Sequence, residues 1–114
     1  MPALGNTYDV EARETIANTE EVRVHTLHLA WPQAVPWHKH SVVDDTFVCM
    51  WGSMIVATDV APREICLRPG EMYKVEAGVA HSVRPGSNLG TKFLVIQATG
   101  RHDYIPDTGR SMRA

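Results

Sequence analysis

The sequence predicts an all-β domain closed into a sandwich or barrel. At 114 residues the chain has the size of one domain, since two independent units would each be too small to bury a sufficient core. From Val22 onward, alternating stretches rich in β-branched residues recur every eight to twelve residues, with Pro and Gly turns between them. A closed double sheet is favoured because an open sheet of this length would leave two edges exposed.

Composition and charge exclude several classes of protein. Hydrophobic residues make up 44% and charged residues 21% of the chain, which is ordinary for a globular domain and unlike a disordered one. The 11 basic and 13 acidic residues give a formal net charge of -2. Without a basic surface to hold phosphates, nucleic acid is not an expected partner.

Neither a membrane segment nor a secretory signal is expected. Apolar runs, such as those at 53–57 and 93–96, fall far short of the roughly 20 residues that cross a bilayer. The start, MPALGNTYDVEARE, lacks the basic and apolar regions of a signal peptide. We therefore expect a cytoplasmic protein. Its two cysteines, Cys49 and Cys66, are expected to be free thiols, because two are too few for a disulfide framework.

The elements follow from the pattern in chain order. Residues 1–20 form a short N-terminal lead-in, in which 8–20 are polar with scattered apolar residues and fit a short helix or an irregular segment. These 20 residues could also add a strand or pack across a dimer partner. The β-barrel domain is expected over 21–105 and a flexible tail over 106–114. The expected strands are 22–30, 37–41, 45–50, 53–59, 63–68, 72–76, 80–84 and 91–99.

Three histidines and an aspartate indicate a metal site. His38 and His40 are two positions apart in PWHKH, so in a strand their imidazoles share one face, about 7 Å apart along the backbone. Asp45 follows after a short reversal, and His81 lies in a later strand after a Gly turn. A divalent metal would let such polar groups be buried together. Histidines on a surface strand, or histidines with internal partners, are the alternative.

These residues also carry a resemblance to the cupins. The first cupin motif consists of Gly, five intervening residues, His-x-His, three or four intervening residues, Glu, six intervening residues and Gly. Here His38-Lys39-His40, four residues, Asp45, six residues and Gly52 match all but the leading Gly. Aspartate therefore stands where most cupins have glutamate.

The second cupin motif consists of Gly, five intervening residues, Pro-x-Gly, two intervening residues, His, three intervening residues and Asn. Gly70, the Gly of Glu76-Ala77-Gly78, and His81 match, whereas Glu76 and Pro85 replace the motif's Pro and Asn. The two motifs together span residues 38–85, and the strand pattern extends the resemblance over about 22–99.

The resemblance implies a fold and a ligand set. The fold is a cupin-type double-stranded β-helix, or jelly-roll barrel, with a short N-terminal lead-in, commonly paired as a homodimer. The metal ligands are His38, His40, Asp45 and His81, for a divalent ion such as Fe, Mn, Ni or Zn. Asp is one methylene shorter than Glu and could act through water. Asp44 could replace Asp45 as the ligand only if the strand shifted by one residue, which would turn Phe47 and Cys49 out of the core.

Further residues are candidates for the pocket. Gln97 is a polar residue in an apolar strand and could bind substrate, or could face outward on an edge strand. His102 and Tyr104 follow the last strand and could fold over the barrel mouth as catalytic groups, or Tyr104 could simply anchor the C-terminus. Cys49 fits core packing better than a nucleophilic role. The remaining, weaker candidates are Tyr73, Arg84 and one of His25 and His28, which lie on opposite faces of the first expected strand.

The main functional hypothesis is a metal-dependent enzyme of the dioxygenase, isomerase, lyase or decarboxylase type. Its substrate would be a small oxygenated compound, such as a keto acid, a diketone, a catechol-like ring or a sugar acid. One alternative is a non-catalytic module that binds a small ligand or sugar and keeps a structural metal. Another is a metal-free barrel whose histidines are satisfied internally.

Overall fold

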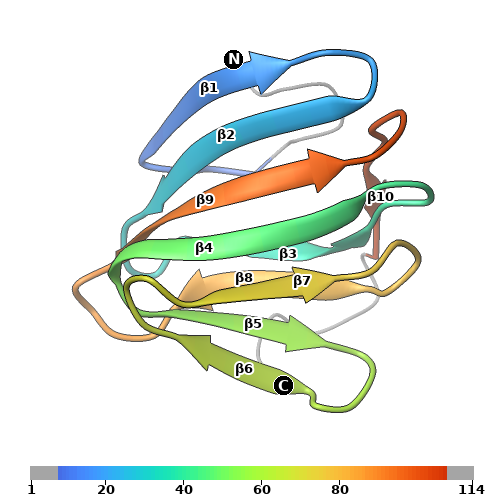
Figure 1. Ribbon diagram of the computed structural model, residues 1–114. Coiled ribbons are helices and arrows are strands. Elements are labelled where there is room, and N and C mark those ends of the chain that lie inside the picture. Colours follow the sequence, from blue (N-terminus) through green and yellow to red (C-terminus); the bar gives the residue numbers. More distant parts are fainter. Residues whose placement is uncertain (1–7, 108–114) are drawn as a thin grey trace.

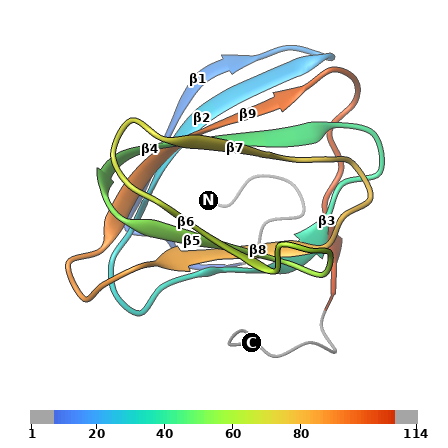
Figure 2. The ribbon, with the colours of Figure 1, turned by 60° about the horizontal axis from the view of Figure 1, so that its bottom comes forward.

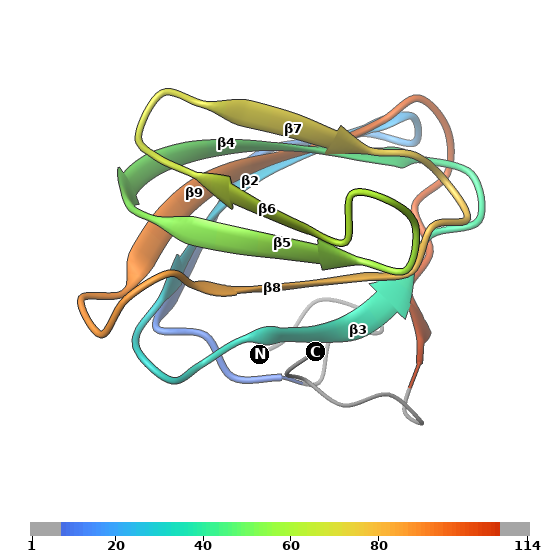
Figure 3. The ribbon, with the colours of Figure 1, turned by 90° about the horizontal axis from the view of Figure 1, so that it is seen from below.

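The computed structural model describes residues 8–107 as two antiparallel sheets packed face to face (Figures 1 and 3). The first, sheet A, has the strand order β1-β2-β9-β4-β7. Its strands are β1 (Ala12–Asn18), β2 (Val22–Leu29), β9 (Thr91–Ala98), β4 (Asp44–Gly52) and β7 (Met72–Val75).

The second, sheet B, has the order β10-β3-β8-β5-β6. Its strands are β10 (Ile105–Pro106), β3 (Val35–Lys39), β8 (His81–Pro85), β5 (Met54–Thr58) and β6 (Glu64–Leu67). Seen after the turn of Figure 2, sheet A forms the upper wall of the barrel and sheet B the lower one. The expected all-β jelly-roll barrel is confirmed, and each of the eight expected strands is present with its ends shifted by at most two residues.

Both ends of the chain differ from the sequence prediction. Ala12–Asn18 is a strand, not a helix or an irregular segment, and it pairs with β2 from Ala12↔His28 to Asn18↔Arg23. This pairing supplies the backbone partners that β2 would lack as an edge strand, and it outweighs the weak helical pattern. At the other end, Pro106 belongs to β10 and the Asp107 N–H donates to the Trp37 carbonyl. The rest of the expected flexible tail, 108–114, lies outside the described residues.

The inner faces of the two sheets form the core, and one end is apolar while the other is polar. In sheet A, two sets of inward-pointing residues that are paired across β2, β9 and β4 show this difference, and each set is called a row. The apolar row consists of Leu27, Phe93 and Cys49, each at most 3% exposed. The polar row, four residues further along each strand and so about 13 Å away, consists of Arg23, Gln97 and Asp45.

The second glycine of the first motif has a steric role at the end of β4. Gly52 has a φ of 71°, and a Cβ placed there would lie 2.3 Å from the Gly90 carbonyl oxygen. Only glycine tolerates both conditions. Residues 8–107 contain no helix that is long and apolar enough to cross a membrane.

Candidate metal centre

The three imidazoles of the candidate site come from neighbouring parts of sheet B. His38 lies near the end of β3, His40 follows that strand, and His81 begins β8 as the register partner of His38. The His38 and His81 ring centroids are 4.3 Å apart, and the Gly78 N–H donates to the His40 carbonyl at 2.7 Å. The turn that carries the second motif's glycine is thereby fixed to the strand end that carries the first motif's histidines.

Asp45 reaches the same point from the opposite sheet. Its Oδ2 lies 2.9 Å from His81 Nε2, 3.0 Å from His40 Nε2 and 4.0 Å from His38 Nε2. The ligand atoms of all four residues lie within 4.8 Å of one another, and each residue is at most 3% exposed. These four buried residues could therefore hold one metal ion.

Backbone carbonyls fix the orientation of every ring. His38 Nδ1 donates to the Pro36 carbonyl at 2.7 Å, His81 Nδ1 donates to the Val79 carbonyl at 2.9 Å, and His40 Nδ1 donates to the Asp103 carbonyl. In a neutral imidazole the Nε2 then carries a lone pair, and all three lone pairs face the Asp45 carboxylate.

Such a set of electron-rich atoms could hold a cation at its centre. The second Asp45 oxygen, Oδ1, is also buried and has no hydrogen-bond partner among residues 8–107. Imidazole nitrogens with one carboxylate oxygen suit ions such as Fe, Mn, Ni and Zn, and the Nδ1–H to carbonyl bonds are the usual outer support of such ligands. The residues present therefore fit a divalent ion.

The electrostatics also favour metal binding. Burial, together with the nearby His81, lowers the pKa of His38 to about 3, so this ring stays neutral and able to ligate at any ordinary pH. Burial opposes ionisation of Asp45, but the hydrogen bonds and charges of His40 and His81 outweigh it and hold the pKa of that carboxyl well below its usual range. Burial likewise opposes charging of His40, yet Asp45 and Asp103 raise its pKa, so a proton competes with a metal chiefly at this ring.

The two adjacent aspartates have different environments. Asp45 faces the interior together with Phe47 and Cys49, as the pleat argument predicts. Asp44 instead accepts the Ala77 N–H at 2.9 Å and lies 3.7 Å from Lys74 Nζ. Asp44 thus stabilises the turn that precedes His81 and does not face the metal centre.

The segment after β9 covers the candidate site. The Tyr104 ring stacks on the His38 ring at a centroid distance of 4.5 Å and an interplanar angle of 18°, and the His102 ring lies 5.0 Å from the His40 ring. Asp103 accepts the Ser41 N–H at 2.8 Å and the Ser41 hydroxyl. This segment therefore both anchors the chain and closes the barrel mouth over the imidazoles.

The remaining polar row lies next to the ligands. Gln97 is 6% exposed, and its Nε2 lies 3.4 Å from His40 Nε2. The outward, edge-strand alternative for Gln97 is wrong, because β9 lies between β2 and β4. Arg23 Nη1 donates to His102 Nδ1 at 2.6 Å. Burial, with the charge of Arg23, lowers the pKa of His102 to about 4, and burial raises the pKa of Tyr104.

The sequence left open which of His25 and His28 looks inward, and it missed other residues around the site. His25 is the inward one and is 5% exposed. Arg13 Nη2 donates to the Tyr8 hydroxyl at 3.2 Å, and the Tyr8 ring stacks on Tyr104 at 6.1 Å. The face shared by Arg23, His25 and the buried leucines of β2 could have identified His25. Arg13 and Tyr8 were not singled out, because the pattern of residues 8–20 did not separate an added strand from a helix or an irregular segment.

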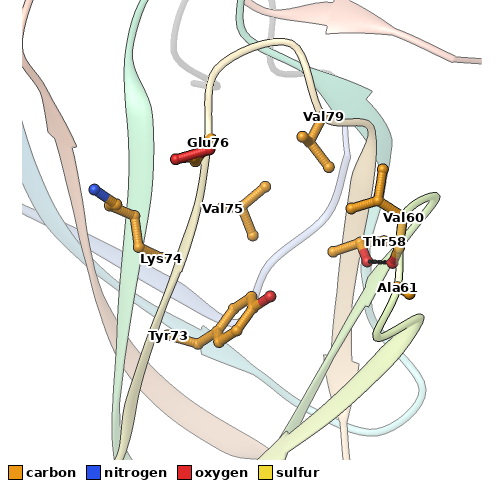
Figure 4. A pocket seen from close by; sticks show the side chains of 8 residues that line it. All are labelled: Thr58, Val60, Ala61, Tyr73, Lys74, Val75, Glu76 and Val79. Atoms are coloured by element: carbon orange, nitrogen blue, oxygen red, sulfur yellow. Dashed lines mark hydrogen bonds between the residues drawn. The ribbon is translucent and has the colours of Figure 1, made fainter.

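A pocket of about 270 Å³ opens at the seam between β7 and the β5–β6 turn (Figure 4). Two of its lining residues adjoin ligands, because Val75 is the register partner of Asp45 and Thr58 that of His81. Tyr73 also lines this pocket, whereas Arg84 forms an ion pair with Glu64 at 2.8 Å. The pocket therefore approaches the metal centre from the side but contains none of its ligands.

Comparisons with known proteins identify the fold and no closer relation. Neither the scan against protein-family models nor the search of curated proteins gives a match. Among solved structures, a cupin-2 domain containing protein from Shewanella frigidimarina is 23% identical, with a TM-score of 0.64 over 81% of this chain and 84% of that one. An uncharacterised protein with a double-stranded β-helix domain from Klebsiella pneumoniae is 18% identical, with a TM-score of 0.73 over 93% and 88%.

An enzyme also has this fold. The DMSP lyase DddQ from Ruegeria pomeroyi is 14% identical, with a TM-score of 0.68 over 79% of this chain and 47% of that one. At such identities the similarity establishes the cupin fold that the two motifs indicated.

Proposed function

We propose that this protein is a metal-dependent enzyme that acts on a small oxygenated organic compound, with one divalent ion held by His38, His40, Asp45 and His81. One observation carries the proposal. Three buried imidazoles, each fixed by a carbonyl at Nδ1, point their Nε2 atoms at one buried carboxylate. Without a cation this arrangement would bring together lone pairs and negative charge at a cost in stability.

The chemistry divides between the ion and the residues around it. When bound, a divalent ion polarises a carbonyl or carboxylate or lowers the pKa of a bound water. Gln97 lies beside His40 and can donate a hydrogen bond to a substrate oxygen. His102 is neutral at pH 7 because its pKa is about 4, so it can accept a proton only weakly, while Tyr104 is protonated and can donate one. That a lyase shares this fold supports catalysis by analogy.

Elemental analysis of tag-free protein tests the metal site. We expect about one divalent ion per chain in the wild type, loss of that ion in His81→Ala, and retention in the matched control His28→Ala, whose ring lies outside the site. Added metal should raise the melting temperature of the wild type and of His28→Ala only. A wild type without stoichiometric metal, or unchanged metal content in His81→Ala, would contradict the proposal.

Catalysis is tested separately from metal binding. Protein loaded with Fe(II) or Mn(II) is screened for loss of keto acids, diketones, catechols and uronates, with oxygen uptake followed in parallel. Gln97→Ala should retain the metal and lose substrate turnover. Turnover by metal-free protein, or full turnover by Gln97→Ala, would contradict the assigned roles.

A non-catalytic ligand-binding module is the second candidate, and one observation favours it. Both side chains proposed for proton transfer are held by neighbours: the Arg23 guanidinium donates to His102, and the Tyr104 ring stacks on the rings of His38 and Tyr8. A screen in which a compound binds the metal-loaded protein without being consumed would favour this function over the enzymatic one.

The proposal includes a homodimer formed through the outer face of sheet A. This face exposes Met72, Met50 and Trp51, which are 62%, 47% and 49% exposed, and Leu94 and Val48 lie half-buried beside Met72 in the register. Light scattering should give twice the 12.7 kDa chain mass for the wild type and the chain mass for Met72→Lys. A monomeric wild type would contradict this part of the proposal.

A further inference from the structure

Three buried polar atoms beside the metal centre lack a hydrogen-bond partner among residues 8–107. They are Arg13 Nη1, His25 Nδ1 and Gln97 Oε1. His25 and Gln97 are 5% and 6% exposed, so bulk water does not satisfy them. Buried polar groups in folded proteins are almost always paired, and a cluster of unpaired ones indicates that something else occupies the space.

Contacts connect this cluster to the metal centre. Arg23 is the register partner of Gln97, and Gln97 is that of Asp45. Arg23 Nη1 also reaches His102, whose ring lies 5.0 Å from the His40 ring. The Arg23 guanidinium therefore reaches the ligands through His102, and the Arg23 backbone is linked to Asp45 through the strand pairing with Gln97.

Arg13 borders the same space from β1. It pairs with Leu27, which lies on the inward face of β2 two positions from His25. Its Nη2 donates to the Tyr8 hydroxyl, and Tyr8 stacks on Tyr104, which in turn stacks on His38. Two guanidinium groups thus border the interior beside the metal centre.

The charge of this region identifies the ligand class. Within residues 8–107, no carboxylate forms an ion pair with either arginine. Burial, and then the positive charge of Arg13, lowers the pKa of Arg23, as expected for two like charges that share a partly desolvated space. An anion placed between them would relieve this repulsion and accept the free N–H of Arg13.

We propose that Arg13 and Arg23, with His25, form a carboxylate-binding subsite next to the metal centre. The substrate would then be a small organic acid with one carboxylate separate from the oxygens that face the metal. Guanidinium groups suit this role because their planar fork of donors matches a carboxylate. The inference rests on the proposed function, since it assigns a substrate class to the same site.

Calorimetry with two matched probes tests the subsite on Mn(II)-loaded protein. 2-Oxoglutarate and 2-oxopentanoate share the keto-acid end and differ only in a distal carboxylate against a methyl group. We expect the wild type to bind the diacid at least about tenfold more tightly, the range expected for one charge-assisted contact. Arg13→Gln and Arg23→Gln should each weaken diacid binding about 10- to 100-fold and leave the monoacid affinity unchanged.

Two further variants sharpen the test. Arg68→Gln, on the exposed surface, should behave as the wild type. Arg23→Lys keeps the charge but not the fork, so it should restore only part of the diacid preference. Circular dichroism and metal content are measured for every variant. If Arg23→Gln fails to fold, Arg13→Gln still tests the subsite, because Arg13 lies on β1, the edge strand of sheet A.

The outcomes separate the two proposals. A metal-loaded wild type that binds both acids equally or neither, or arginine variants that keep the diacid preference, would overturn the subsite and leave the metal site intact. A wild type that takes up no Mn(II) would overturn the proposed function and the subsite together.

Discussion

The two ends of the barrel interior are built from the same three strands and serve opposite purposes. At the apolar row, Leu27, Phe93 and Cys49 are closely packed and at most 3% exposed. At the polar row, Arg23, Gln97 and Asp45 meet the histidines, and two of their buried oxygens lack partners among residues 8–107. The comparison indicates that the apolar end stabilises the fold, while the polar end costs stability that a bound ion and substrate would restore.

The largest expected effect lies at the apolar end. Phe93 is 0% exposed and packs against Phe47 at a ring distance of 5.9 Å. Phe93→Ala should lower the free energy of unfolding by about 3–5 kcal/mol, because it removes buried apolar area and leaves a cavity. Urea unfolding measures this loss, and the folded fraction should keep the wild-type metal content. Leu89→Ala, at a position that is 72% exposed, should change stability by less than about 0.5 kcal/mol. Equal effects would contradict the assignment of the core.

At the polar end, the two adjacent aspartates provide a matched pair. Asp45→Asn should weaken metal binding by at least about 100-fold, or about 2.7 kcal/mol, because the amide keeps the shape of the ligand and removes its charge. Asp44→Asn should stay within about threefold of the wild type, because Asp44 bonds the Ala77 N–H outside the metal centre. Competition with a coloured chelator measures both affinities. A larger loss in Asp44→Asn would show that Asp44 is the ligand.

The same contrast explains how much the sequence could predict. The two-residue period identifies the strands and the inward residues of β4, and the motif spacing identifies the four candidate ligands, because both depend on local geometry. Before residue 20 the pattern left a short helix, an irregular segment or an added strand open, because β1 exists through its pairing with β2. Arg13 was missed for that reason. The support of His40 by Asp103 was missed because it comes from a backbone carbonyl, which carries no signature in the side-chain pattern.

A smaller effect is expected from His25, which lies between the two rows. Burial, then the charges of Arg13 and Arg23, lowers its pKa to about 4 from an ordinary value of 6.5. Between these values the unfolded chain binds more protons than the folded one, so stability falls as the pH falls. From pH 7 to pH 5 the expected loss through His25 is about 2 kcal/mol.

Urea unfolding at both pH values, in the presence of a chelator, measures this loss without competition from metal. His25→Gln should lose about 2 kcal/mol less than the wild type between pH 7 and pH 5, because it no longer titrates. His28→Gln, on the outward face of the same strand, should keep the wild-type dependence. Identical pH dependence in the wild type and His25→Gln would show that His25 is not held neutral by burial.

The smallest effect separates the two thiols. Cys49 belongs to the apolar row and is 1% exposed, whereas Cys66 is exposed, and burial raises the pKa of the Cys49 thiol. A water-soluble disulfide reagent should therefore modify one thiol per native chain rapidly in the wild type and none in Cys66→Ser. The Cys66→Ser substitution should change the free energy of unfolding by less than about 0.5 kcal/mol. Cys49→Ala should keep the fast thiol. Two fast thiols in the wild type would mean that the apolar row opens to solvent, and a reactive Cys49 would then have to be reconsidered as part of the chemistry.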